Sequence, residues 1–260
     1  MVNGEIKVSG VVKRFTQPDG GTVTALNGVN LDVEAGSFVS FIGPSGCGKS
    51  TLLRLIAGLD KPTEGTLTLD GEEITRPSYE RGLVFQNPTL FSWLTIYDNI
   101  AFSLKARGIY KENKNLVNEY LELVGLKDFA SAYPHQLSGG MAQRASIARA
   151  LVGHPKVLLL DEPLGALDAF ARMNMQDEIL RIRSEKNMTM IMVTHDVDEA
   201  IYLSDKIVVM SPRPAKIEEI IDVGLYGQRA RNNPEFLRLR SEILEVLHYA
   251  GKVEEPDYYI

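Results

Sequence analysis

The stretch GPSGCGKST, residues 43–51, has the residue types and spacing of a phosphate-binding loop. It fits the pattern G-x-x-x-x-G-K-[ST] between an apolar run, SFVSFI, and a helical run, KSTLLRLIAGL. Glycines let backbone N–H groups converge on an anion, Lys49 adds a positive charge, and Ser50 offers a hydroxyl to Mg²⁺. A glycine-rich turn without a ligand is the weaker alternative, because both flanks are correct. We expect the contacts to come from Gly43, Pro44, Ser45, Gly46, Cys47, Gly48, Lys49, Ser50 and Thr51.

Three other apolar runs end in polar side chains that could act on a phosphate. VLLLDEP ends in Asp161 and Glu162, MIMVTHD delivers His195, and GLVFQ closes with Gln86. Such groups at the carboxyl ends of parallel strands face a ligand crevice. Asp161 would hold Mg²⁺ through water, and Glu162 would polarise an attacking water. His195 would hydrogen-bond the terminal phosphate, and Gln86 would ligate Mg²⁺ or the water.

Taken singly, these signals have plain alternatives. Asp161 and Glu162 could form a solvated acidic loop or a helix cap, and Gln86 alone says little. The presence of a phosphate loop in the same chain favours the catalytic interpretation. It applies to all four residues: Asp161, Glu162, His195 and Gln86.

A second candidate anion site lies at LSGGM, residues 137–141, directly before AQRASIARAL. Ser138 can cap a helix there, and Gly139 and Gly140 allow a ligand to approach its positive N-terminal end. One chain would then carry two helix ends that bind phosphate.

The pattern of β-like and helical runs around these residues predicts an α/β fold. Short β-like runs up to about residue 42 indicate an antiparallel region that leads into a buried strand, and three helical patterns follow within about 87–155. From residue 156 strands and helices alternate, which is typical of a mainly parallel sheet with flanking helices. We expect a domain over residues 1–230, with a helical subdomain inserted at about 87–155, and a C-terminal helical extension over 231–260. In that extension Phe236, Leu239, Ile243 and Leu247 would share one face.

Net charge, apolar runs and cysteine content limit the classes of protein to which the chain can belong. The net charge of −6 gives no electrostatic reason to bind nucleic acid or anionic lipid directly. No apolar run reaches the ~18 residues of a membrane helix, and the first residues lack the apolar region of a signal peptide. Cys47 is the single cysteine, which agrees with a reducing compartment. We expect a cytosolic protein whose membrane role, if any, goes through a protein partner.

In this order the motifs resemble the ATP-binding cassette of ABC transporters, whose core is a P-loop nucleotidase fold. LSGGM is similar to the family signature LSGGQ, GALD to its D-loop, and Phe15 in VVKRF to the aromatic residue that stacks on adenine. The resemblance implies head-to-tail dimers in which Ser138 and Gly140 contact the γ-phosphate of the partner's ATP. It implies that Asp168 lines the same interface. Met141 replaces the usual glutamine, as it commonly does in nitrate, sulfonate and taurine importers.

The resemblance therefore implies the ATPase subunit of an importer that binds ATP and Mg²⁺ at the cytoplasmic face of the cell membrane. It would work as a homodimer, or with a second cassette, beneath permease subunits served by a solute-binding protein. The permease would dock near Gln86, at an apolar cluster formed by Leu90, Phe91, Trp93 and Leu94, although clusters of this sort are usually core. The alternatives are a soluble ABC ATPase acting on nucleic acid or ribosomes, and a small-molecule P-loop kinase. The second leaves the signature, the D-loop and His195 unexplained.

Overall fold

A computed structural model describes residues 3–18, 20–225, 229, 231 and 233–250. The chain divides into two compact units. Unit 1 comprises Met1–Gly4, Glu34–Gly36 and Arg76–Met192, and unit 2 comprises Glu5–Val33, Ser37–Thr75 and Val193–Ile260. Within the described part of the chain, no helix is long and apolar enough to cross a membrane.

Unit 2 contains an antiparallel sheet in the strand order β2, β1, β4, β5. Its strands are β1 (Ile6–Thr16), β2 (Thr22–Val33), β4 (Glu64–Leu69) and β5 (Glu72–Glu73). Ile6 of β1 lies opposite Val33 on one side and Leu69 on the other. All three side chains are buried, because alternate residues of a strand point to the same face. This sheet matches the antiparallel region expected at the start of the chain.

The phosphate loop of unit 2 connects β3 (Phe38–Ile42) to α1 (Lys49–Ala57). All five residues of β3 are buried, and β3 pairs in parallel with β9 (Lys206–Met210). The strand β10 (Ile217–Asp222) adds to β9 in antiparallel orientation. The loop is thus held between a fully buried strand and a helix that buries most of its own residues.

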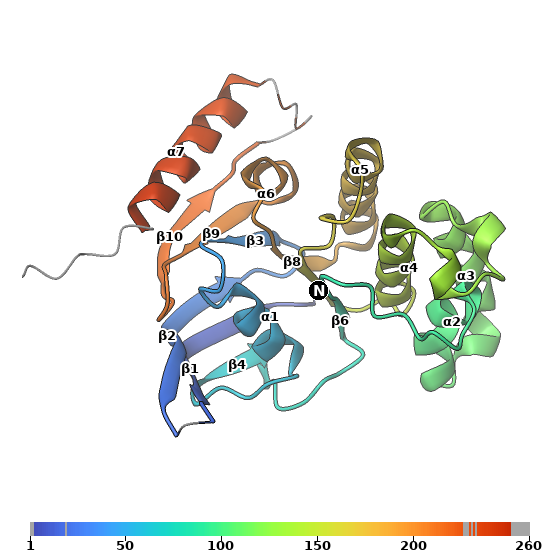
Figure 1. Ribbon diagram of the computed structural model, residues 1–260, viewed down its shortest axis with the longest axis horizontal. Helices are drawn as coiled ribbons and strands as arrows, with labels where there is room; N and C mark the ends of the chain where they lie inside the picture. Colours follow the sequence, from blue (N-terminus) through green and yellow to red (C-terminus); the bar gives the residue numbers. More distant parts are fainter. Residues whose placement is uncertain (1–2, 19, 226–228, 230, 232, 251–260) are drawn as a thin grey trace, which may run out of the picture. The chain divides into compact units, whose positions relative to one another are not determined.

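The helices α6 (Val197–Leu203) and α7 (Pro234–Ala250) also belong to unit 2 and lie side by side (Figure 1). Phe236, Leu239 and Ile243 of α7 are buried in a cluster with α6, β9 and β10, and Leu247 packs against that cluster. The predicted apolar face of this helix is confirmed.

Unit 1 contains the parallel pair β6 (Arg81–Val84) and β7 (Val157–Asp161), with β8 (Thr189–Val193) next to β7. Three helices lie between β6 and β7 in the sequence and pack on one another (Figure 1): α2 (Ile96–Ala106), α3 (Tyr110–Leu123) and α4 (Gly139–Leu151). The short 3₁₀ helices Lys127–Phe129 and Pro134–Gln136 connect α3 to α4, and α5 (Ala169–Lys186) follows β7. The expected helical stretch is present, whereas the domain limits at 87–155 and 230 stay predictions.

Candidate functional site

The phosphate loop requires glycine at two positions for steric reasons. Gly43 and Gly48 have φ angles of 153° and 134°, which side chains rarely adopt. A Cβ atom on Gly43 would lie 2.6 Å from the carbonyl oxygen of Met210, and one on Gly48 would lie 2.9 Å from Cδ2 of Leu26. The loop therefore packs tightly against the rest of unit 2. Gly48 is also the residue that precedes α1, so backbone N–H groups of the first turn are free of a side-chain cap from that position.

Lys49 places its ammonium group inside this loop. Its Nζ atom donates to the carbonyl oxygens of Gly43 and Pro44 at 2.8 and 2.9 Å, and it lies 3.9 Å from Sγ of Cys47. Lys49 and Cys47 are buried, whereas Ser45, Gly46 and Ser50 are exposed. The buried charge and the exposed backbone together form a cradle suited to an anion.

Unit 2 also carries Phe15 and His195. Phe15, on β1 opposite Val23, exposes 42% of its surface, and the Nζ atom of Lys13 lies 4.9 Å from the ring centroid. An exposed aromatic face of this kind can stack on a planar base. His195 is exposed in the connection between β8 and α6.

Unit 1 brings Gln86 and Glu162 together, although 76 residues separate them in the sequence. The amide Nε2 of Gln86 donates to Oε2 of Glu162 at 2.8 Å. Asp161 is the last residue of β7, and Glu162, immediately after it, has a φ angle of 45°. Non-glycine residues with positive φ are uncommon and cluster at functional sites. The carboxylate of Glu162 is thus held in a defined direction at the end of a buried strand.

The signature residues begin α4. Ser138 caps this helix, with its hydroxyl oxygen accepting from the N–H of Met141 at 3.3 Å, and Gly139 and Gly140 form the first turn. A Cβ atom on Gly140 would lie 3.2 Å from Cδ2 of Leu167. Asp168 caps α5 in the same way, accepting from the N–H of Ala171 at 2.9 Å. Both predicted interface residues therefore also stabilise the start of a helix.

Two residues of α4 that the sequence did not single out hold the segment around Gln86. Gln143 is fully buried, and its Nε2 atom donates to the carbonyl oxygen of Phe85 at 3.0 Å. Arg149 donates to the carbonyl and hydroxyl oxygens of Thr89 at 2.7 and 3.0 Å. Burial lowers the pKa of the Arg149 guanidinium. These contacts span about as many residues as the Gln86 contact, so no local pattern could reveal them.

In unit 2, Arg213 makes another contact that no local sequence pattern could reveal. Its Nη2 atom donates to the carbonyl oxygen of Gly46 at 2.6 Å, across 167 residues of sequence. This contact ties the exposed part of the phosphate loop to the segment after β9.

An aromatic cluster, formed by Phe91, Trp93 and Phe102, follows the Gln86 segment. Its ring centroids lie 5.3 Å apart for Phe91 and Trp93, and 4.5 Å apart for Phe91 and Phe102. Arg149 lies over the Phe91 ring at 5.6 Å. Trp93 exposes 72% of its surface and Phe102 43%. The interpretation of Trp93 as a core residue is therefore excluded for this chain.

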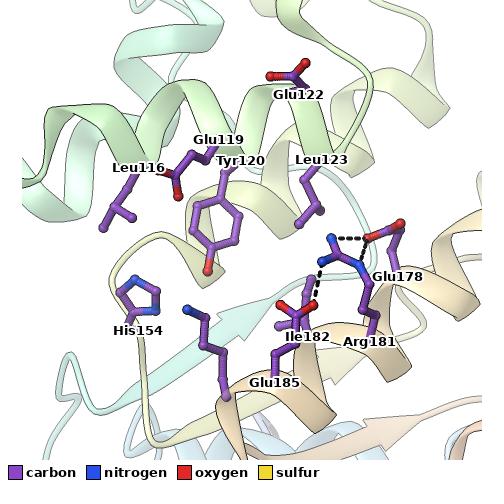
Figure 2. Close-up of a pocket in the computed structure, with 11 residues that line it drawn as sticks. Leu116, Glu119, Tyr120, Glu122, Leu123, His154, Glu178, Arg181, Ile182 and Glu185 are labelled. Atoms are coloured by element: carbon purple, nitrogen blue, oxygen red, sulfur yellow. Dashed lines mark hydrogen bonds and ion pairs between the residues drawn. The ribbon is translucent and has the colours of Figure 1, made fainter.

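A pocket of about 450 Å³ lies between α3 and α5 (Figure 2). The Tyr120 ring projects from α3 toward His154, with ring centroids 6.0 Å apart, and Arg181 pairs with Glu178 and Glu185. Burial, with a smaller contribution from nearby carboxylates, raises the pKa of Tyr120 to about 12. None of the eleven residues drawn in Figure 2 is a predicted site residue, so this pocket is not the predicted site.

The comparison with known families decides the class of the protein. The family described as ABC transporter matches residues 26–165, which include the phosphate loop, the signature and Glu162. The chain belongs to the ABC transporter family.

Two relatives match this ABC chain along almost its whole length. The aliphatic sulfonates import ATP-binding protein SsuB of Bacillus cereus is 48% identical over 96% of this chain and 98% of the relative. The bicarbonate transport ATP-binding protein CmpC of Synechococcus elongatus is 46% identical over 96% of this chain, which spans only 39% of CmpC.

The fold is similar to that of a solved ABC cassette. The ATP-binding cassette MJ0796, solved as a dimer bound to ADP and Pi, superimposes with a TM-score of 0.76 at 32% identity. The match covers 85% of this chain and all of that one. The predicted α/β cassette fold is confirmed, and the family assignment establishes ATP as the nucleotide.

Proposed function

We propose that this ABC chain is the ATP-hydrolysing subunit of an importer, which couples ATP hydrolysis to uptake of a solute through a membrane permease. The observation that supports this most strongly is the likeness to an import ATP-binding protein over 96% of the chain. The relatives named above are transport proteins and give no support to an action on nucleic acid.

The proposed binding of ATP uses the groups of unit 2. The loop formed by residues 43–51 binds the phosphates through its backbone, and the Lys49 ammonium exchanges its loop carbonyls for phosphate oxygens. Phe15 stacks on adenine, and His195 hydrogen-bonds the γ-phosphate.

The proposed chemical step is attack by water on the γ-phosphate. Glu162 polarises the water, and the hydrogen bond from Gln86 fixes the direction of its carboxylate. A role of this kind is typically worth about 10²–10⁴-fold in rate.

The chain also offers oxygen donors of the kind that Mg²⁺ prefers: the Ser50 hydroxyl, the Asp161 carboxylate and the Gln86 amide oxygen. Ser50 is exposed at the first turn of α1, and Asp161 is half-buried at the end of β7. Each of these groups is of a type that can ligate the ion. When bound with ATP, Mg²⁺ would neutralise charge on the phosphate oxygens.

We propose that two copies of the chain pair head to tail. The N-terminal end of α4, with Ser138, Gly139 and Gly140, would contact the γ-phosphate of ATP bound to the partner copy, and Asp168 would line the same interface. The dimeric arrangement of MJ0796 supports this. Met141 leaves the capping serine and the helix N–H groups in place, so its substitution for glutamine should affect only contacts beyond the phosphate.

The permease is proposed to dock at the aromatic cluster of Phe91, Trp93 and Phe102. An exposed tryptophan beside two further aromatic rings is a frequent anchor of protein interfaces. Arg149 connects this cluster to α4 and to Thr89. A displacement of the cluster on docking would therefore reach the segment that carries Gln86. In this proposal the chain lies peripherally at the cytoplasmic face of the membrane and has a solute-binding protein as an indirect partner.

The proposed solute is a small oxyanion such as an aliphatic sulfonate, taurine or nitrate. The relatives' names, aliphatic sulfonates for SsuB and bicarbonate for CmpC, support this class.

Purification of the tagged chain from membranes of its own host tests this function. We expect ATP hydrolysis and an integral membrane protein in the same complex, and we expect Trp93→Ala to lose the membrane protein. Phe129→Ala is the matched control, because Phe129 is another exposed aromatic residue of unit 1 that lies outside the cluster. A chain that hydrolyses ATP but copurifies with nucleic acid or ribosomes instead would contradict the importer function.

A further inference from the structure

His195 lies between two residues whose positions are fixed by hydrogen bonds. Thr194, before it, is only 2% exposed, and its N–H donates to the carbonyl oxygen of Phe41 in β3 at 3.2 Å. Asp196, after it, caps α6 by accepting from the N–H of Glu199 at 3.1 Å. His195 is thus an exposed side chain on a short, well-anchored connection.

The Thr194 hydroxyl joins the two anchors. Its oxygen accepts from the N–H of Asp196 at 3.1 Å, and its hydrogen is donated to Oε2 of Glu199 at 2.5 Å. One hydroxyl group, on the residue before His195, therefore contacts the backbone of the residue after it. The orientation of that hydroxyl depends in turn on the carboxylate of Glu199.

Glu199 is an unusual residue for this place, because it is 5% exposed, whereas Asp198, the other carboxylate of α6, is half-exposed. Acidic side chains are almost never buried to this degree unless they are paired or hydrogen-bonded. A charged acceptor makes a shorter and stronger hydrogen bond than a neutral one. The contact with Thr194, the residue before His195, gives this buried side chain a hydrogen-bond partner.

We propose that Glu199 is a positioning residue for His195: through the Thr194 hydroxyl it fixes the backbone that aims the imidazole at the γ-phosphate. Glu199 does not touch ATP. Its effect on hydrolysis passes through His195 alone, so this inference rests on the role proposed above for His195.

A double-mutant cycle separates positioning from general stability. We expect Glu199→Ala to lower kcat for ATP by about 10²-fold, the size of effect that small misplacements of reacting groups produce, with KM little changed. In a His195→Ala background, the same change should lower kcat by less than about twofold, because nothing remains to be positioned. Thr194→Val, which removes the hydroxyl but keeps the shape, should behave like Glu199→Ala. Glu199→Gln should retain most activity, because its amide oxygen still accepts from Thr194.

Asp198→Ala is the matched control on the same helix, since the half-exposed Asp198 pairs only on the surface, with Arg240 at 2.8 Å. It should leave kcat unchanged. Equal losses from Glu199→Ala in the wild-type and His195→Ala backgrounds would overturn the proposal, because Glu199 would then act independently of His195.

Imidazole NMR tests the positioning without relying on activity. The chain has four histidines, so the signal that disappears in His195→Ala identifies His195. We expect that signal to shift or broaden in Glu199→Ala and in Thr194→Val but not in Asp198→Ala. An unchanged His195 signal in both variants would overturn the proposal. If the signal moves while His195→Ala hydrolyses ATP at the native rate, the positioning stands and the proposed role of His195 fails.

Discussion

Replacing Gly48 by alanine tests how closely the phosphate loop is packed, and Gly46→Ala is its matched control in the same loop. Both glycines have positive φ angles, 134° for Gly48 and 72° for Gly46. Only Gly48 is crowded: an added Cβ would lie 2.9 Å from Cδ2 of Leu26 and 3.1 Å from the carbonyl oxygen of Ala25. At Gly46 the nearest atom, Nη2 of Arg213, is 3.9 Å away.

The expected costs follow from these contacts. Gly46→Ala adds only left-handed backbone strain, about 1–2 kcal/mol. Gly48→Ala adds two costs: backbone strain, in a region of φ that side chains adopt even more rarely, and overpacking against β2. Each should destabilise the fold by about 1–3 kcal/mol, and together by about 2–6 kcal/mol. Gly48→Ala should therefore lower the free energy of unfolding clearly more than Gly46→Ala does.

Urea unfolding followed by circular dichroism measures this difference, and titration with a fluorescent ATP analogue measures binding in the same samples. Mg·ATP should bind Gly48→Ala more weakly, because the shifted backbone precedes α1. Equal stability of the two variants would refute the packing argument. A Gly48→Ala protein as stable as the wild type would refute it as well.

Two further predictions concern the only cysteine and one histidine. A bulky thiol reagent on the buried Cys47, whose Sγ lies 3.9 Å from Nζ of Lys49, should block ATP hydrolysis, and Mg·ATP should slow the labelling; full activity after stoichiometric labelling would contradict this. Burial, and to a smaller extent the charge of Lys186, lowers the pKa of His154. As the pH drops below about 6.5, this histidine is therefore protonated in the unfolded chain before it is protonated in the folded chain, and folding stability should fall. His154→Asn, which suits the φ angle of 47° at this position, should weaken that acid dependence in urea unfolding series; an unchanged or steeper dependence would count against this interpretation.

The sequence predicted those features of the site that depend on local patterns. The phosphate loop, the strand that ends in Asp161 and Glu162, and the helix that begins after Ser138 are each specified within about ten residues, because turn chemistry and hydrophobic periodicity act at short range. The apolar face of α7 could be predicted for the same reason.

The parts that escaped prediction depend on contacts between distant residues. Gln143 and Arg149 reach partners 58 and 60 residues away, and β10, with the sequence IEEIID, forms a strand because β9 supplies its hydrogen bonds. The sequence left open whether Trp93 is exposed or part of the core, since a large apolar residue in an apolar run is more often buried. The roles of the individual site residues stay predictions, which measurements of ATP binding and hydrolysis can test.

The central claim is that ATP bound to one chain is capped by Ser138 and its helix in a second chain. Size-exclusion chromatography with multi-angle light scattering tests it most directly, using Glu162→Gln to slow hydrolysis while leaving the phosphate loop intact. We expect Glu162→Gln to have twice the monomer mass with Mg·ATP and the monomer mass without it. The additional change Ser138→Arg should keep the protein monomeric although it still binds ATP, because a long side chain blocks the capping helix end. A Glu162→Gln protein that binds ATP yet stays monomeric, or a double variant that still dimerises with ATP, would contradict the account.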